Sequence, residues 1–183
     1  MSKVYVFLAD GFEEIEGLTV VDLLRRAGIE TITVSVMGRE KIIGSHRIPV
    51  TADTLIGKVH PTKEDMLVLP GGMPGTLHLG DCEGLKGFLM KAAEENGRIA
   101  AICAAPTVLG KLGLLNGRKA ICYPGMEDGL TGAEVTVEPV VTDGNITTSR
   151  GLGTAIPFAL RLIEELSGKE TADRIAESVV YQA

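Results

Sequence analysis

The sequence predicts an α/β domain in which helices cover both faces of a mostly parallel sheet. Short apolar segments alternate with segments whose apolar residues recur at helical spacing. Parallel strands need crossover connections, and helices supply them, so this alternation favours parallel pairing with both faces of the sheet covered. A chain of 183 residues has room for one such domain, and we expect a single domain spanning 1–183.

The first half of the chain begins with a strand and a helix. Residues 4–8 are an uninterrupted apolar strand, and the apolar helical face after it ends at Arg25-Arg26, where basic side chains suit the negative end of the helix dipole. Gly28 suits a left-handed cap. The other elements predicted in this half are a strand at 31–36, a hairpin at 41–50 turning around Gly44-Ser45, a strand at 66–69 and a helix with one apolar stripe from Leu85 to Ala92.

The second half continues the alternation and contains neither internal repeats nor low-complexity linkers. A hairpin is expected around Asp143-Gly144-Asn145, because this tripeptide favours a tight turn between strands. The other predicted elements are strands at 99–102 and 119–123 and helices at about 106–112, 154–166 and 172–179, with Gly168 ending the second of these helices.

Composition and charge exclude several classes of function. The chain is 45% hydrophobic and 23% charged, as in ordinary globular proteins, and its formal charge of −6 with no Lys/Arg run argues against nonspecific nucleic-acid binding. Acid interrupts the first apolar run too early for a signal peptide, and no uncharged stretch of about 18 residues offers a membrane span. We therefore expect a cytoplasmic protein without a membrane partner.

The three cysteines form an odd set at 82, 103 and 122. Their spacing matches neither a disulfide framework nor a zinc site, so at least one thiol is expected to be free. Cys82, in a predicted helix start, and Cys122, inside a predicted strand, are interpreted as packing residues.

Three loops leave predicted parallel strands at the same end of the sheet. They are residues 10–16, 70–75 and 103–106. In open α/β sheets the working crevice lies beyond the carboxyl ends of the strands. We therefore expect these loops to converge on a site.

Cys103 occupies the strand-to-helix turn of the third loop. A nucleophile elbow requires small residues two positions on either side, and Ala101 and Ala105 stand there. The N–H groups at the start of the next helix favour a thiolate, and Pro106 suits the first helical turn. The alternative is that Cys103 is a small buried packing residue, as many free cysteines are.

The acidic run Glu13-Glu14-Ile15-Glu16 has two interpretations. Acidic residues near a helix N-terminus gain from the dipole without any catalytic role, and this is sufficient for Glu13 and Glu14. A carboxyl of Glu16 in an apolar pocket would have a raised pKa and could exchange protons with a sulfur adduct. Backbone N–H groups of Gly71 and Gly72 could add oxyanion donors from the neighbouring loop.

The histidines constrain the chemistry by their positions. His46, His60 and His78 all precede Cys103, so a triad with a late histidine, as in glutamine amidotransferases, cannot be built in that order. All three are expected to be solvated surface residues. A zinc site needs several converging ligands, and the sequence shows no such cluster, so we expect no metal.

Four ordered motifs carry a resemblance that runs through nearly the whole chain. The sequence resembles the ThiJ/PfpI superfamily, in the branch of Parkinson disease protein 7, and this implies a flavodoxin-like three-layer α/β sandwich that is usually a homodimer. The hairpin at 41–50 is a plausible surface for that dimer. The motifs are Gly11-Phe12-Glu13-Glu14-Ile15-Glu16, Leu69-Pro70-Gly71-Gly72, Ala101-Ile102-Cys103-Ala104-Ala105-Pro106 and Thr148-Ser149-Arg150-Gly151.

The resemblance also implies a site and a function. Cys103 corresponds to an easily oxidised cysteine and Glu16 to a protonated glutamate bonded to it, with oxyanion donors at Gly72 and Ala104 and with Gly71 beside them. The implied activity is a cofactor-free glyoxalase or deglycase acting on small aldehydes or on glycated protein or nucleotide. The alternative is a redox-sensing stress protein or chaperone without turnover, or a scaffold whose site has drifted.

Two positions depart from the family pattern. Peptidase relatives have a histidine directly after the cysteine, whereas this chain has Ala104, which disfavours an intracellular cysteine peptidase. The deglycase branch commonly has a histidine before a proline in the strand after the elbow helix, but here Tyr123 precedes Pro124. A phenol donates hydrogen bonds but is a poor base at neutral pH. Tyr123, Pro124 and Arg150 are candidate pocket residues.

Overall fold

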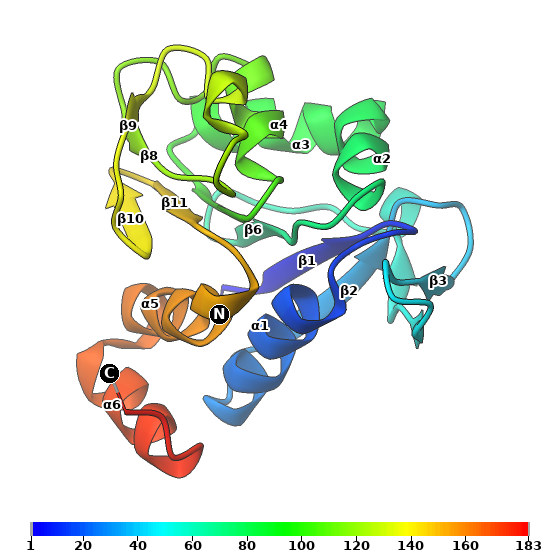
Figure 1. Ribbon diagram of the computed structural model, residues 1–183. Helices are drawn as coiled ribbons and strands as arrows, with labels where there is room; N and C mark the ends of the chain where they lie inside the picture. The colour runs from blue at the N-terminus through cyan, green and yellow to red at the C-terminus, as the bar shows by residue number, and fades with distance from the viewer. Residues whose placement is uncertain (1, 183) are drawn as a thin grey trace.

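The computed structural model describes residues 2–182 and contains a seven-stranded sheet between two layers of helices (Figure 1). Neighbouring strands are parallel except for β10 and β11, which pair antiparallel. The predicted mostly parallel sheet is therefore confirmed. The strand order is β10 (Val140–Asp143), β11 (Ile146–Ser149), β7 (Arg98–Ile102), β6 (Met66–Leu69), β1 (Val4–Leu8), β2 (Thr31–Ser35) and β5 (Thr54–Leu55).

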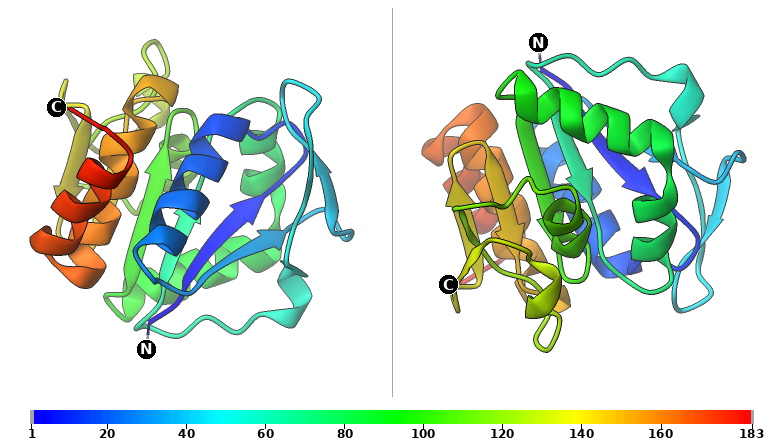
Figure 2. Two further views of the ribbon diagram at one scale, coloured as in Figure 1. Left: turned by 90° about the horizontal axis from the view of Figure 1, so that it is seen from below. Right: turned by 90° about the horizontal axis from the view of Figure 1, so that it is seen from above.

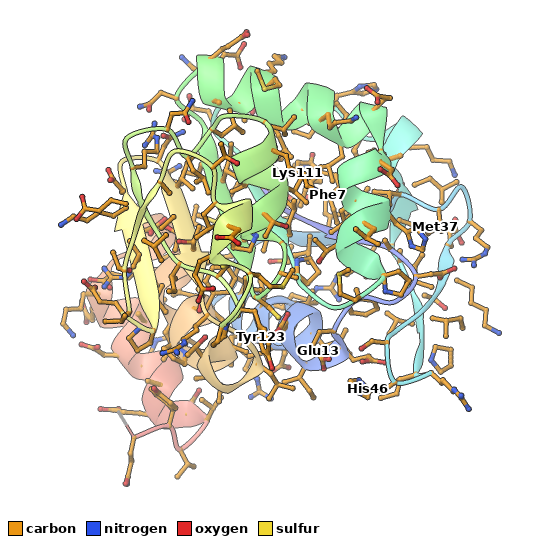
Figure 3. The ribbon with its side chains drawn as sticks, turned by 45° about the horizontal axis from the view of Figure 1, so that its top comes forward. Phe7, Glu13, Met37, His46, Lys111 and Tyr123 are labelled. Carbon is orange, nitrogen blue, oxygen red and sulfur yellow. The ribbon has the colours of Figure 1, made fainter. Side chains whose placement is uncertain are left out.

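Helices cover both faces of the sheet, as Figure 2 shows from below and above. Alternate side chains of β1 enter different cores. Leu8 packs in the core beneath α1 and α5, whereas Phe7, labelled in Figure 3, packs on the opposite face, where its ring centroid lies 6.4 Å from that of Phe88. One layer consists of α1 (Glu14–Arg26), α5 (Ala155–Ser167) and α6 (Lys169–Ser178), and the other of α2 (Gly75–Asp81), α3 (Glu83–Glu94) and α4 (Pro106–Lys111). The central strands are buried on both sides, which explains why they have no polar alternation.

Two small sheets and three 3₁₀ turns complete the fold. The predicted hairpin forms β3 (Lys41–Ile43) and β4 (Pro49–Thr51) and projects at one edge of the molecule (Figure 2). The other elements are β8 (Lys119–Ala120) and β9 (Glu134–Val135), which pair in parallel, and the 3₁₀ turns at Ile56–Lys58, Glu127–Gly129 and Leu152–Thr154.

The turn predictions at Gly28 and Gly144 are confirmed, since both adopt a positive φ, of 78° and 61°. The predicted strand at 119–123 is wrong beyond Ala120, because the later backbone groups bond to other partners. The N–H of Ile121 donates to the Thr148 hydroxyl (3.0 Å).

None of the helices within residues 2–182 has the length and apolar character needed to cross a bilayer.

Candidate active site

Cys103 lies at the sharp turn between β7 and α4. Its φ is 64°, a left-handed conformation that a non-glycine residue adopts at a cost. The small residues Ala101 and Ala105 stand two positions on either side, and both are fully buried. The N–H of Cys103 donates to the carbonyl of Ser149 on β11 (3.0 Å), which ties the turn to the sheet. The predicted sharp strand-to-helix turn is confirmed, and the role of Cys103 as a nucleophile stays a prediction.

Glu16 reaches this cysteine from the first turns of α1. Only 1% of the residue is exposed, and its carboxyl group is close enough to the Cys103 thiol that each group shifts the pKa of the other. The N–H of Gly71 donates to Glu16 Oε2 (2.9 Å). The loops that follow β1, β6 and β7 therefore converge, as the parallel topology predicts.

The two glycines after β6 have different functions at the site. The backbone N–H groups of Gly72 and Ala104 are close enough to the sulfur of Cys103 to lower its pKa, which opposes the effect of burial. The prediction that Gly71 is a third oxyanion donor is wrong, because its N–H is already bonded to Glu16. A Cβ at Gly71 would lie 2.5 Å from Cys103 Cβ and 2.7 Å from Glu16 Oε2, so a side chain there would separate the pair.

The helix after the elbow contributes little beyond Ala104. α4 spans only Pro106–Lys111, and a helix of under two turns has a weak dipole. The N–H of Thr107 donates to the Ala104 carbonyl (3.1 Å), and that of Val108 to the Ala105 carbonyl (2.9 Å), inside the turn. We predicted several free N–H groups at the start of this helix near the sulfur, but only the N–H group of Ala104 remains available.

Burial raises the pKa of both reactive groups. The pKa of Glu16 rises to about 7, because burial outweighs the hydrogen bonds from Cys103 and Gly71. Burial also raises the pKa of Cys103, to about 12, and the negative charge of Glu16 adds to this rise. The pair therefore holds two protons below about pH 7 and one above it. Above pH 7 the negative charge is favoured on Glu16, and a thiolate beside a protonated Glu16 is the less populated arrangement of the single proton. This burial opposes the thiolate expected from the sequence.

The three candidate pocket residues lie in exposed loops. The N–H of Tyr123 donates to the Cys103 carbonyl (2.8 Å), and the Tyr123 side chain is half exposed. In Figure 3, Glu13 lies between Tyr123 and His46. Pro124 and Arg150 are exposed, and the N–H of Arg150 donates to the Pro139 carbonyl (3.3 Å).

The other sulfur and imidazole groups differ in exposure. Cys82 is half-buried between α2 and α3, and Cys122 is fully buried in the loop after β8 rather than inside a strand. Burial raises the pKa of Cys122 to about 11. His60 is exposed, as expected, whereas His78 is half-buried with its Nδ1 2.9 Å from the Asp10 carbonyl oxygen, so that part of the surface prediction is wrong.

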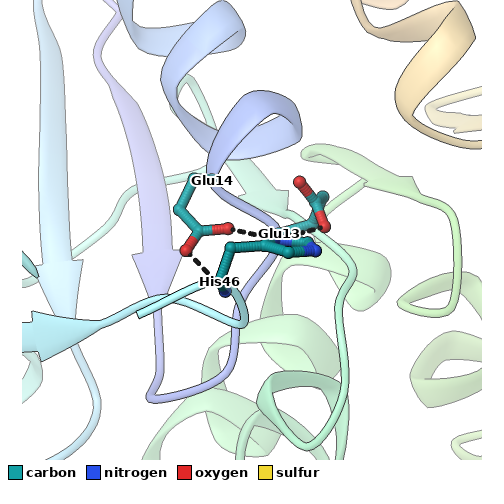
Figure 4. A group of neighbouring side chains, drawn as sticks. All are labelled: Glu13, Glu14 and His46. Atoms are coloured by element: carbon teal, nitrogen blue, oxygen red, sulfur yellow. Dashed lines mark hydrogen bonds and ion pairs between the residues drawn. The ribbon is translucent and has the colours of Figure 1, made fainter. Parts of the chain in front are cut away.

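The structure also contains a cluster of three metal-ligating side chains that we did not expect. His46, in the turn between β3 and β4, places its ring between the carboxylates of Glu13 and Glu14 at the start of α1 (Figure 4). Its Nδ1 lies 3.0 Å from Glu14 Oε2 and 3.4 Å from Glu13 Oε2. The expectation that no such ligands converge is therefore wrong, although the His46 side chain is itself 68% exposed.

Glu14 and His46 perturb each other's titration. Burial on its own would raise the pKa of Glu14, but hydrogen bonds from the His46 ring and from backbone N–H groups lower it to about 2. The hydrogen bond to Glu14 is the main cause of the raised pKa of His46. The interpretation of Glu14 as a residue that only interacts with the helix dipole is incomplete, because Glu14 also anchors the hairpin. No local pattern in the sequence indicates this, since its partner His46 is 32 residues away.

Comparison with known proteins gives consistent matches over the whole chain. A family model described as the DJ-1/PfpI family matches residues 2–165. Protein dj-1beta of Drosophila melanogaster is 42% identical over 184 residues, which cover 98% of each chain. The Parkinson disease protein 7 homolog of Danio rerio is 34% identical, with 98% of this chain and 97% of that protein covered. The solved structure of oxidized Toxoplasma gondii DJ-1 superposes with a TM-score of 0.95 at 39% identity over 100% of both chains.

Proposed function

Because the chain belongs to the DJ-1/PfpI family, we propose that it is a stress-response enzyme that uses Cys103 and Glu16, without a cofactor, on α-oxoaldehydes or their adducts with protein or nucleotide. The observation that carries this proposal is a buried carboxyl in contact with a cysteine sulfur at a positive-φ elbow. Backbone N–H groups of Gly72 and Ala104 reach the same sulfur. Nucleophile, proton acceptor and oxyanion donors are thus within one small site.

The first step is addition of sulfur to the aldehyde carbon. The ionised Glu16 carboxylate takes the thiol proton as the Cys103 sulfur forms a bond to that carbon and the carbonyl π electrons move to its oxygen. The N–H groups of Gly72 and Ala104 lie where they can stabilise the oxyanion. Proton transfer from Glu16 then gives a neutral hemithioacetal and leaves a carboxylate.

The second stage moves a hydrogen between the two substrate carbons. The Glu16 carboxylate takes the proton from the former aldehyde carbon and returns it to the ketone carbon through an enediol, giving a thioester. The first carbon is oxidised and the second is reduced, so no external oxidant is needed. Water then cleaves the carbon–sulfur bond, which releases a 2-hydroxy acid and restores the thiol.

The test is formation of D-lactate from methylglyoxal. We expect the parent protein to turn over, Cys103→Ser to be inactive, and Glu16→Gln to lose at least about 10²-fold in kcat, as expected when a general base is removed. Cys82→Ser is the matched control, because Cys82 is also a half-buried thiol. Activity that survives Cys103→Ser would overturn this mechanism.

A second function, redox sensing, is favoured by the same donors. The Toxoplasma gondii relative has been solved in an oxidized form. In this chain, peroxide would convert the Cys103 thiol to a sulfenic acid and water, and a second peroxide would give a sulfinic acid. Hydrogen bonds from Glu16, Gly72 and Ala104 would hold the added oxygens.

Mass spectrometry after mild peroxide treatment tests this second function. We expect oxygen on Cys103 before Cys82 or the fully buried Cys122. Earlier modification of either other thiol would contradict it. The homodimer implied by the family resemblance stays a prediction, which sedimentation equilibrium would check.

A further inference from the structure

Four donor atoms meet where the β3–β4 hairpin contacts the start of α1. They are Glu13 Oε2, Glu14 Oε2, Ser45 Oγ and His46 Nδ1. The serine oxygen lies 3.2 Å from each carboxylate oxygen and 3.0 Å from the imidazole nitrogen. The imidazole nitrogen lies 3.0 Å from Glu14 Oε2 and 3.4 Å from Glu13 Oε2. Five of the six pairs are therefore close.

Hydrogen bonds alone cannot satisfy this group. The Ser45 hydroxyl has one proton and His46 Nδ1 has one at most, whereas the ionised carboxylates of Glu13 and Glu14 have none. Two protons are thus available for five close contacts, so three contacts have no proton of their own, and one of the two Ser45–carboxylate contacts joins two oxygens with no proton between them. Glu14 is only 2% exposed, so solvent gives its carboxylate little screening. A cation between the four atoms would turn every contact into a favourable one.

The separations match a tetrahedral metal. A zinc ion bonded to nitrogen and oxygen at about 2.0–2.1 Å holds its ligand atoms about 3.3 Å apart. The five separations here range from 3.0 to 3.4 Å. One imidazole and two carboxylates, with a hydroxyl in the fourth position, form a small donor set. Calcium instead takes six to eight oxygens, so the chemistry favours zinc.

Surrounding groups already hold these ligands in place. The other oxygen of Glu14, Oε1, accepts hydrogen bonds from the backbone N–H groups of His46 (2.8 Å) and Ile48 (3.4 Å), which leaves Oε2 directed at the cluster. A Cβ at Gly44 would lie 2.1 Å from Glu14 Oε1, so the hairpin backbone packs directly on the carboxylate. Such outer contacts orient metal ligands in proteins. The exposed His46 ring leaves the cluster open to solvent.

We propose that Glu13, Glu14 and His46 bind one zinc ion per chain, with Ser45 Oγ in the fourth position. This site uses no atom of the Cys103–Glu16 pair, although the charge of Glu13 contributes to the raised pKa of Glu16. It joins the hairpin to the N-terminal end of α1, so the bound ion stabilises the contact between these two elements.

Zinc binding by the full chain, after treatment with a chelator and dialysis, tests the proposal. We expect saturation at one ion per chain in titration calorimetry and in metal analysis. His46→Ala should weaken affinity by at least about 100-fold, the upper end of the loss seen when only an outer contact is removed. Glu13→Gln is a second variant, and His60→Ala is the matched control, since His60 is another exposed histidine.

Cobalt substitution distinguishes this site from binding at a thiol. Cobalt in the proposed site gives a tetrahedral visible spectrum without a thiolate charge-transfer band, and Cys103→Ser retains both the spectrum and one bound zinc. Circular dichroism confirms that each variant is folded. Unchanged affinity in both folded His46→Ala and Glu13→Gln, loss of zinc in Cys103→Ser, or binding that never saturates at one ion per chain would overturn the proposal.

Discussion

Gly71→Ala tests whether close packing of Cys103 and Glu16 is required. The φ of Gly71 is one that alanine can adopt, so the substitution adds a methyl group without forcing the backbone. That methyl group would lie 2.5 Å from Cys103 Cβ, about 0.9 Å closer than the 3.4 Å at which ordinary contact begins, and 2.7 Å from Glu16 Oε2. Either the pair separates or the loop moves.

Both responses have a measurable cost. Overpacking of this kind destabilises by about 1–3 kcal/mol, which moves a urea midpoint by about 1 M for a protein of this size. Displacement of the reacting groups by nearly 1 Å costs about 10²-fold in rate. We therefore expect Gly71→Ala to lower both the urea midpoint and kcat/KM for D-lactate formation.

Gly87→Ala is the matched control for this change. Gly87 is exposed on α3, and a Cβ there meets nothing within 4 Å. The control should keep full activity and gain about 0.5–1 kcal/mol from its helical position. The reasoning would be refuted by a Gly71→Ala protein with the stability and the activity of the parent, because the pair would then tolerate a side chain between its members.

Three further predictions follow from the titrating groups. In chelator-treated protein, the parent should lose about 3 kcal/mol of unfolding free energy relative to Glu16→Gln as pH rises from about 4.5 to 7. The reason is that a carboxyl with a raised pKa stabilises the fold only while its proton is bound. Urea midpoints of the two proteins that change in parallel across this range would contradict the prediction. NMR titration should give His46 a pKa above 6.5, and this pKa should fall in Glu14→Gln, with the resonance of His60 as the reference. An unchanged His46 pKa in Glu14→Gln would refute the pairing of His46 with Glu14. Tyr123→Phe should cost far less in kcat than the about 10²-fold expected for loss of a general acid–base group, and a loss of that size would make the phenol catalytic.

Local patterns were sufficient to predict the elbow. Cys103 lies between an apolar strand and Pro106, with alanines on either side, and all of these constraints act within five residues of the chain. Convergence of the three loops followed from the parallel order of strands, which places their carboxyl ends together. The fold and the proximity of Cys103 and Glu16 were therefore accessible from sequence periodicity and motif.

Contacts over long separations were not accessible in this way. The prediction at 119–123 failed because the Ile121 N–H bonds to Thr148, a side chain 27 residues later, rather than continuing a strand ladder. Gly71 was assigned to the oxyanion because no pattern shows that Glu16, 55 residues earlier, already occupies its N–H. In each case a hydrogen-bond partner distant in sequence decided the outcome.

Glu14 and Glu16 show most clearly why residue type alone does not set chemistry. Both lie in the first turns of α1, and both are almost fully buried. Glu14 accepts hydrogen bonds from the His46 ring and from backbone N–H groups, and its pKa falls to about 2. Glu16 accepts one backbone N–H and faces a weakly donating thiol, and its pKa rises to about 7. Hydrogen-bond donors around Glu14 outweigh the effect of its burial, whereas the donors around Glu16 do not, so Glu14 is ionised at neutral pH and Glu16 keeps its proton up to about pH 7.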